Sequence, residues 1–200
     1  MLLLVAIIAS PASAHLTPNS EISLEIGQSR LDATITIPLG ELEYAEPGFR
    51  AVREITGLAE RRMIDRYLRH HMSARSPDDR AWTIRVTETN IGGDPADLSA
   101  RVTLAPPAGA STRHLSLRYD AVIDHIPNHI ALVVLKSDFD AGHLSDRPEL
   151  LGGIRQGSET ILIDRGPGSA LRGFGAAIGL GIHHIAEGHD HLLFLVALLL

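Results

Sequence analysis

The stretch EISLEIGQSRLDATITI, residues 21–37, contains two runs in which apolar and polar side chains alternate. The apolar members are Ile22, Leu24 and Ile26, followed by Leu31, Ala33, Ile35 and Ile37. Alternation with a period of two is typical of a β-strand that buries one face. These residues therefore predict two strands, over 21–26 and 31–37.

Similar patterns recur along the following part of the chain. Alternating runs occupy residues 82–86, 98–104 and 115–119, and more continuous apolar runs occupy 130–135 and 161–163. About seven strands separated by Pro, Gly and Asp turns indicate a β-sandwich. One helix is predicted among them, over 58–72, where one face carries Ile64, Tyr67, Leu68 and His71. We expect this helix to cover one end of the sandwich.

Composition excludes several classes of site. The 200 residues carry a formal net charge of −6, with acidic and basic residues interspersed, and include no cysteine. No basic patch or aromatic platform is present, so nucleic acid is not expected as a partner. The lack of cysteine excludes disulfides, thiolate metal ligands and a cysteine nucleophile. Any metal site must therefore use nitrogen and oxygen ligands.

Residues 1–14 have the pattern of an export signal. Leu2 to Ile8 form a short apolar run, and Ala12-Ser13-Ala14 is a cleavage site of the A-x-A kind. Because the apolar run is short for a bilayer crossing, we favour a cleaved signal peptide over an uncleaved anchor. The β-rich domain, residues 15–164, is then expected outside the cytoplasm.

Near the C-terminal end, ionisable side chains lie within a run that otherwise suits lipid: GIHHIAEGHDHLLFLVALLL, residues 181–200. A helix turns about 100° per residue, so one set of these side chains shares roughly a third of the circumference. The set is His183, His184, Glu187, Asp190 and His191. Polar groups at membrane depth are costly, so a functional role is the default interpretation.

This arc of side chains predicts part of a site for a divalent transition metal. Imidazole nitrogens suit Ni, Co, Zn, Cu and Fe, and carboxylates tune charge or carry protons. One helix cannot surround an ion, so other helices must complete the coordination. The alternative is a polar stripe that lines a proton path, or a polar seam between packed helices, without metal.

The order His184, five residues, Asp190, His191 resembles the signature of the HupE/UreJ family of membrane proteins. That family is associated with hydrogenase and urease maturation and with nickel movement. The resemblance implies a polytopic protein of the bacterial inner membrane, in which His184, Asp190 and His191 on the first core helix contact the metal. The extra polar residues His183, Glu187 and His189 depart from the signature, and the resemblance gives them no role.

The same resemblance implies the overall organisation and the cargo. The branch of the family most similar to this chain carries a signal peptide and an extracytoplasmic β-rich domain before its membrane part. Nickel is the implied ion, with Co, Zn or Cu as other candidates, and it is a substrate rather than a cofactor. A metallochaperone or a metalloenzyme-maturation protein is the implied partner.

Enzyme motifs are not satisfied. A zincin needs His-Glu-x-x-His and an inverted zincin needs His-x-x-Glu-His, but His184-x-x-Glu187 is followed by Gly188. No nucleophile elbow is present, so we do not expect an enzyme.

Gly175 and Gly179 form a small-xxx-small pair that lets another helix approach closely.

The β-rich domain carries histidines of its own, at His70, His71, His114, His125, His129 and His143. We expect them to be scattered surface side chains. The alternative is a relay that hands metal to the C-terminal helix.

These observations give a mainly β, sandwich-like extracytoplasmic domain with one helix, followed by an α-helical transmembrane segment. The expected parts are a signal peptide (1–14), the β-rich domain (15–164), a linker (165–169) and a first core transmembrane helix (170–200). The last of these ends within an apolar run, so we expect a truncated membrane part whose missing helices, with lipid, surround it.

Two functions remain open. The first is transport or delivery of a transition metal. The second is a non-transporting accessory or sensor role, in which the β-rich domain binds a partner and the polar helix is a proton relay or a packing seam.

Overall fold

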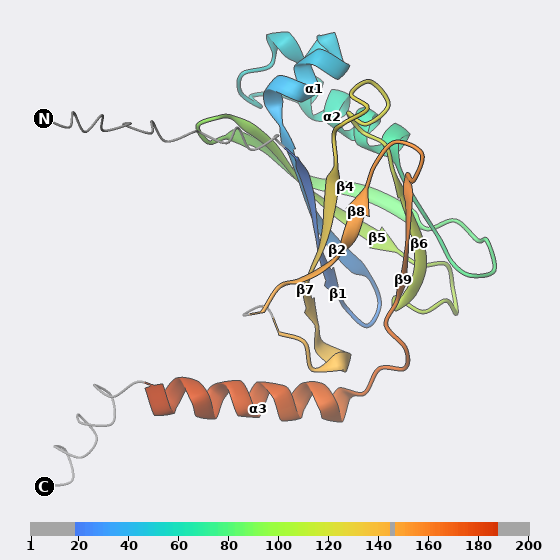
Figure 1. Ribbon diagram of the computed structural model, residues 1–200, viewed down its shortest axis with the longest axis vertical. Coiled ribbons are helices and arrows are strands. Elements are labelled where there is room, and N and C mark those ends of the chain that lie inside the picture. Colours follow the sequence, from blue (N-terminus) through green and yellow to red (C-terminus); the bar gives the residue numbers. More distant parts are fainter. Residues whose placement is uncertain (1–18, 145–146, 188–200) are drawn as a thin grey trace, which may run out of the picture.

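The computed structural model describes residues 19–144 and 147–187, and for residues 184, 186 and 187 it describes the backbone alone. Strands dominate residues 20–164, here called the β domain, and one long helix follows them (Figure 1). The strands are β1 (Ser20–Ile26), β2 (Leu31–Pro38), β3 (Met72–Arg75), β4 (Thr83–Gly92), β5 (Asp97–Ala105), β6 (His114–Tyr119), β7 (Ala131–Asp138), β8 (Glu149–Ile154) and β9 (Thr160–Asp164). The helices are α1 (Leu39–Ala45), the 3₁₀ helix η1 (Pro47–Ala51), α2 (Leu58–His71), the 3₁₀ helix η2 (Phe139–Ala141) and α3 (Ala170–Glu187).

The strands form two sheets. The larger has the order β4-β5-β2-β1-β7-β8, and the smaller has the order β3-β6-β9. All pairs within these sheets are antiparallel except β1 with β7, which run parallel. Pairing of β1 with β2 places Ile22 opposite Ile35 and Leu24 opposite Ala33, so the alternating apolar residues of both strands lie on one face.

One hydrophobic core joins the two sheets to the helices. It includes Leu24 and Ile35 of the larger sheet, Leu117 of the smaller sheet, and Leu42 and Leu68 of the helices, all fully buried. The prediction of a mainly β domain is confirmed. The alternation of β1 and β2 explains it, because each strand buries one face against this core.

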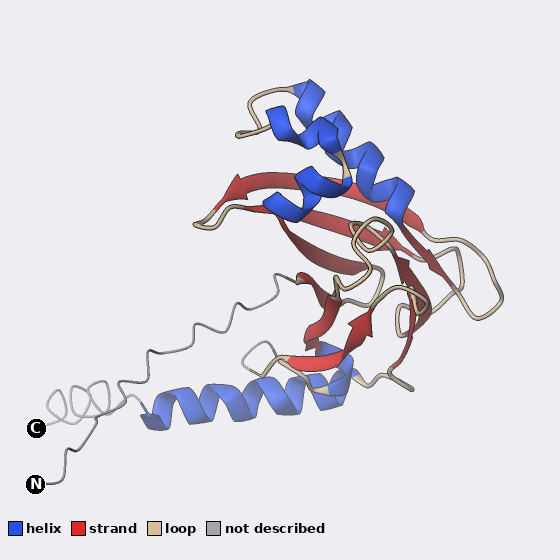
Figure 2. Ribbon diagram, turned by 45° about the horizontal axis from the view of Figure 1, so that its top comes forward, coloured by secondary structure: helices blue, strands red, loops and turns tan. Residues whose placement is uncertain are grey.

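Helices α1 and α2 cover one side of the β domain, and α3 lies on the opposite side (Figures 1 and 2). Ile64, Tyr67 and Leu68 are buried on α2, as the apolar face predicted. The prediction of a single helix in the domain was wrong, because α1 and η1 precede α2. Pro38 ends β2, and the short apolar face of Leu39, Leu42 and Ala45 is buried against the core.

Two of the nine described strands were not predicted. β3 follows α2 without a helix-breaking residue, and Met72 takes an extended conformation where the helical pattern predicted one more helical position. β8 has the sequence ELLGGI, which does not alternate and contains Gly152 at a φ of 158°. Strand pairing with β6 and β7 therefore decided conformations that local pattern did not.

The predicted signal peptide, residues 1–14, and the end of the predicted transmembrane segment, residues 188–200, lie outside the described residues. Within residues 19–144 and 147–187, no helix has both the length and the apolar character needed to cross a membrane. Residues 165–169 connect β9 to α3.

Candidate functional site

Three of the five predicted metal-binding positions belong to α3. His183, His184 and Glu187 are helical, and a separation of four residues places 183 and 187 on the same face of the helix. The His183 side chain is exposed. Asp190 and His191 lie outside the described residues, so the structure does not place the five side chains relative to one another. In the part of the chain that is described, no group of three or more His, Cys, Asp or Glu side chains is arranged to hold a metal ion.

The N-terminal turn of α3 lies directly against η2. The backbone N–H of Ser169 donates to the carbonyl oxygen of Asp140 at 2.8 Å, and the Phe139 and Phe174 rings meet edge to face at 5.5 Å. Gly173 is required for this approach, since a Cβ there would lie 2.4 Å from the carbonyl oxygen of Phe139. The helix is therefore seated on the β domain through its first turns.

A buried ionic cluster holds the connecting segment. The Arg113 side chain is 8% exposed and pairs with Asp138, which is 0% exposed. The Arg113 Nε donates to the carbonyl oxygen of Gly166, and its Nη2 donates to the carbonyl oxygen of Arg165, both at 2.8 Å. The linker is thus fixed to the β domain by a side chain from the loop before β6.

The same cluster extends to η2 and β8. Asp138 accepts a hydrogen bond from the backbone N–H of Ala141 at 3.2 Å, and Arg165 reaches Glu149 at 2.9 Å. Partial burial lowers the pKa of Arg165, but the hydrogen bond to Glu149 and the charges of Glu149 and Asp138 outweigh it and raise that pKa. We call Arg113, Asp138, Glu149 and Arg165 the linker cluster.

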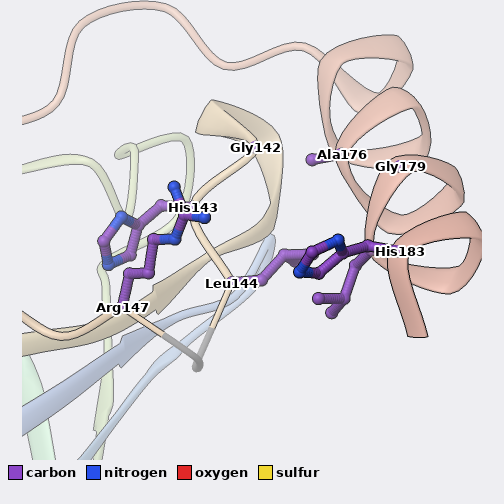
Figure 3. A pocket seen from close by; sticks show the side chains of 8 residues that line it. Gly142, His143, Leu144, Arg147, Ala176, Gly179 and His183 are labelled. Atoms are coloured by element: carbon purple, nitrogen blue, oxygen red, sulfur yellow. The ribbon is translucent and has the colours of Figure 1, made fainter. Parts of the chain in front are cut away.

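A cavity of about 410 Å³ lies between α3 and the segment that follows η2. Figure 3 shows the His183 side chain extending from α3 toward Leu144, while His143 and Arg147 lie beside each other on the β-domain side. Gly142, at a φ of 73°, lets this segment approach the Ala176 position of α3. The two histidines of this cavity therefore do not face each other across it.

The expectation that the histidines of the β domain are scattered surface side chains was wrong for His129. This residue is 0% exposed, and its Nε2 lies 2.8 Å from the Ser20 hydroxyl and accepts the Ser20 backbone N–H at 3.2 Å. Since Nε2 accepts, Nδ1 carries the proton and donates to the Glu41 carboxylate. The imidazole thereby ties together β1, α1 and the turn before β7.

The Ser20, His129 and Glu41 side chains have the order of a hydrolase triad, but Ser20 is fully buried. No described cavity is lined by this hydroxyl. Burial of the Ser20 hydroxyl favours a structural role for this arrangement.

The expectation was also wrong for His71, which is only 11% exposed. Its Nδ1 lies 2.9 Å from Asp120 Oδ1 and 3.8 Å from Asp124 Oδ2. The sequence did carry a signal for this burial, because His71 shares the apolar face of α2. The partners of both His71 and His129 are 49 and 88 residues away, beyond the reach of any spacing rule.

Comparison with known families gives one match. The family model described as HupE / UreJ protein matches residues 159–200, which include β9, the linker and α3. No match was found among curated proteins. The HupE/UreJ family is membrane-associated and is linked to nickel or cobalt transport or to accessory roles. The resemblance seen in the His184, Asp190, His191 spacing is confirmed, because residues 159–200 match the HupE/UreJ family model.

Proposed function

We propose that the protein transports a divalent transition metal, with nickel first, or delivers it to metalloenzyme maturation. The family match carries this proposal, because residues 159–200 include all five side chains of the polar arc. The helical backbone at 183, 184 and 187 supports it, since the periodicity that aligned the arc requires a helix there.

Each residue of the arc has a proposed role. His184 and His191 act as neutral imidazole ligands, and Asp190 acts as an anionic oxygen ligand. His183 or Glu187 moves a proton or orients a ligand through a hydrogen bond. The metal ion loses part of its water shell as it enters from the extracytoplasmic side, and these side chains then replace the remaining water.

The surface of α3 supports a place among other helices or in lipid. Its large apolar side chains Leu171, Phe174, Ile178, Ile182 and Ile185 are each at least 60% exposed. A Cβ at Gly175 or Gly179 would meet nothing within 4 Å in the described chain, so this small-residue face is open to a neighbouring helix. We propose an inner-membrane location with the β domain extracytoplasmic.

Metal uptake tests the proposal. Cells expressing the full-length gene are supplied with Ni, Co, Zn or Cu, and accumulated metal is measured beside the His184→Ala/Asp190→Asn variant. We expect one metal to accumulate and the accumulation to be lost in the variant at equal protein level. His125→Ala is the matched control, because that side chain is exposed on the β domain. Equal accumulation in the variant and the wild type would leave an accessory or sensor role.

A further inference from the structure

A second cavity of about 410 Å³ is lined by residues of η1 and α2 together with Glu46. Helix α2 lies on the side of the β domain away from α3 (Figure 2). The lining residues are Glu46, Phe49, Met63, Arg66, Tyr67, His70 and His71. Phe49 and Tyr67 are buried, and their rings meet edge to face at 5.3 Å. The cavity therefore has a fixed aromatic floor with two histidines beside it.

The His71 ring is oriented by an aspartate. Asp120 Oδ2 accepts a hydrogen bond from the Arg118 guanidinium at 2.5 Å, and its Oδ1 lies 2.9 Å from His71 Nδ1. When Nδ1 donates to Asp120, the lone pair of the imidazole is on Nε2; the polar contacts described for His71, to Asp120 and Asp124, are both made by Nδ1. A carboxylate that fixes one imidazole nitrogen and leaves the other free is the usual support of a metal-binding histidine.

The turn that supplies Asp120 is strained. Val122, two residues later, has a φ of 68°, a region that a β-branched residue rarely adopts. Its backbone N–H donates to the Tyr67 hydroxyl at 3.1 Å, and Val122 is fully buried. Burial raises the pKa of Tyr67, which keeps this phenol un-ionised. Strain of this kind is found where the surrounding structure must hold functional groups in place.

The His70 ring is close enough to His71 to act as a second nitrogen ligand. The His70 and His71 ring centroids are 4.9 Å apart with the rings perpendicular. Two imidazoles that bind one ion through nitrogens at about 2.1 Å have centroids roughly 5 Å apart. His70 is exposed, so its ring can turn toward the ion.

The charges around the two rings favour a cation. Asp120 and Asp124 lie next to His71, and Glu46 lines the cavity, whereas the nearby positive groups are Arg66 and Arg118. With two imidazoles as protein ligands, water fills the remaining positions around the ion.

We propose that His70 and His71 form a binding site for a divalent transition metal on the β domain, distinct from the polar arc of α3. Imidazole pairs favour Cu, Ni, Zn or Co over Ca and Mg. Asp120 is a positioning residue that orients His71. The site does not depend on transport through α3.

Metal titration of the full chain in nanodiscs tests this site. His184→Ala/Asp190→Asn/His191→Ala is the background, which removes the predicted ligands of α3. We expect one equivalent of Ni²⁺ or Cu²⁺ by calorimetry, at least tenfold weaker binding in His70→Ala and His71→Gln, and binding about 10–100-fold weaker in Asp120→Asn. For Cu²⁺, electron paramagnetic resonance should show coupling to two imidazole nitrogens, reduced to one in His70→Ala.

The matched control is His114→Ala, which removes a partly exposed histidine of the same domain that lies outside this cavity. Binding in His70→Ala and His71→Gln as tight as in the background, or an equal loss of binding in His114→Ala, would overturn the site. If the background variant binds the metal but no longer takes it up into cells, the His70 and His71 site stands and the result bears only on the proposed transport function.

Discussion

The β domain and α3 differ in how many of their side chains are buried or paired within the chain. In the β domain, apolar side chains enclose one core, and the buried groups Arg113, His129 and Asp138 all have polar partners. Along α3, most large apolar side chains are exposed, and only the first turns lie against η2. The β domain therefore buries its apolar side chains within the chain, whereas α3 leaves most of its large apolar side chains exposed.

The linker cluster is where the two regions meet, and it provides the largest expected effect. Asp138→Ala leaves the Arg113 guanidinium buried without its anion and also removes the hydrogen bond to Ala141. We expect a loss of about 3–5 kcal/mol in the free energy of unfolding. Chemical denaturation of the chain in detergent measures it. Asp140→Ala, next to it on η2, should lose far less, and an equal loss in both would refute the role of the cluster.

The buried histidine of the β domain should give the next largest effect. His129→Ala leaves the Ser20 and Glu41 groups unpaired, and we expect a loss of about 2–3 kcal/mol. Denaturation beside His125→Ala, whose side chain is 57% exposed, isolates the effect of burial. The control should change stability by less than about 0.5 kcal/mol. A wild-type midpoint for His129→Ala would show that its contacts contribute nothing.

Two glycines of α3 allow a matched comparison. Gly173→Ala places a methyl group against the Phe139 backbone, whereas Gly175→Ala meets nothing within 4 Å. We expect Gly173→Ala to lift α3 from η2 and to make the linker cleave several-fold faster in limited proteolysis. The core of the β domain should unfold as before, because neither glycine belongs to it. Equal cleavage of the two variants would contradict the seating of α3 on η2.

The sequence predicted these regions unequally, for physical reasons. Alternation predicted β1 and β2, and helical periodicity predicted the buried face of α2, because both are local patterns. The glycine-rich strand β8 was missed because its conformation comes from pairing with β7. Arg113 meets Asp138 across 25 residues and Gly166 across 53, so only the folded chain reveals that the linker is fixed.

The two candidate metal sites also differ in how far the sequence predicted them. Helical spacing predicted the arc from His183 to His191 from local pattern alone, and the structure describes a helix for its first three members, His183, His184 and Glu187. The pairing of His71 with Asp120 depends on a strained turn that no spacing pattern predicts.

The smallest effect is spectroscopic. Burial is the main reason that the pKa values of both Tyr67 and Tyr119 are raised. A phenol with a raised folded-state pKa gives stability that is present below its ordinary value of about 10 and is lost as pH rises. We therefore expect these two to form phenolate only when the domain unfolds, as followed by ultraviolet absorbance. Tyr44→Phe removes the exposed third phenol, and any phenolate signal from the folded variant would contradict the burial of the other two.

We propose that the polar arc, residues 183–191, conducts a transition metal. The most direct measurement is Ni²⁺ entry into liposomes that contain the purified protein, compared with His184→Ala/Asp190→Asn and with the His70→Ala variant. We predict that the double variant abolishes Ni²⁺ entry. His70→Ala should retain entry at a measurable rate, because α2, which carries His70, lies on the side of the β domain away from α3. Undiminished entry through the double variant would contradict it.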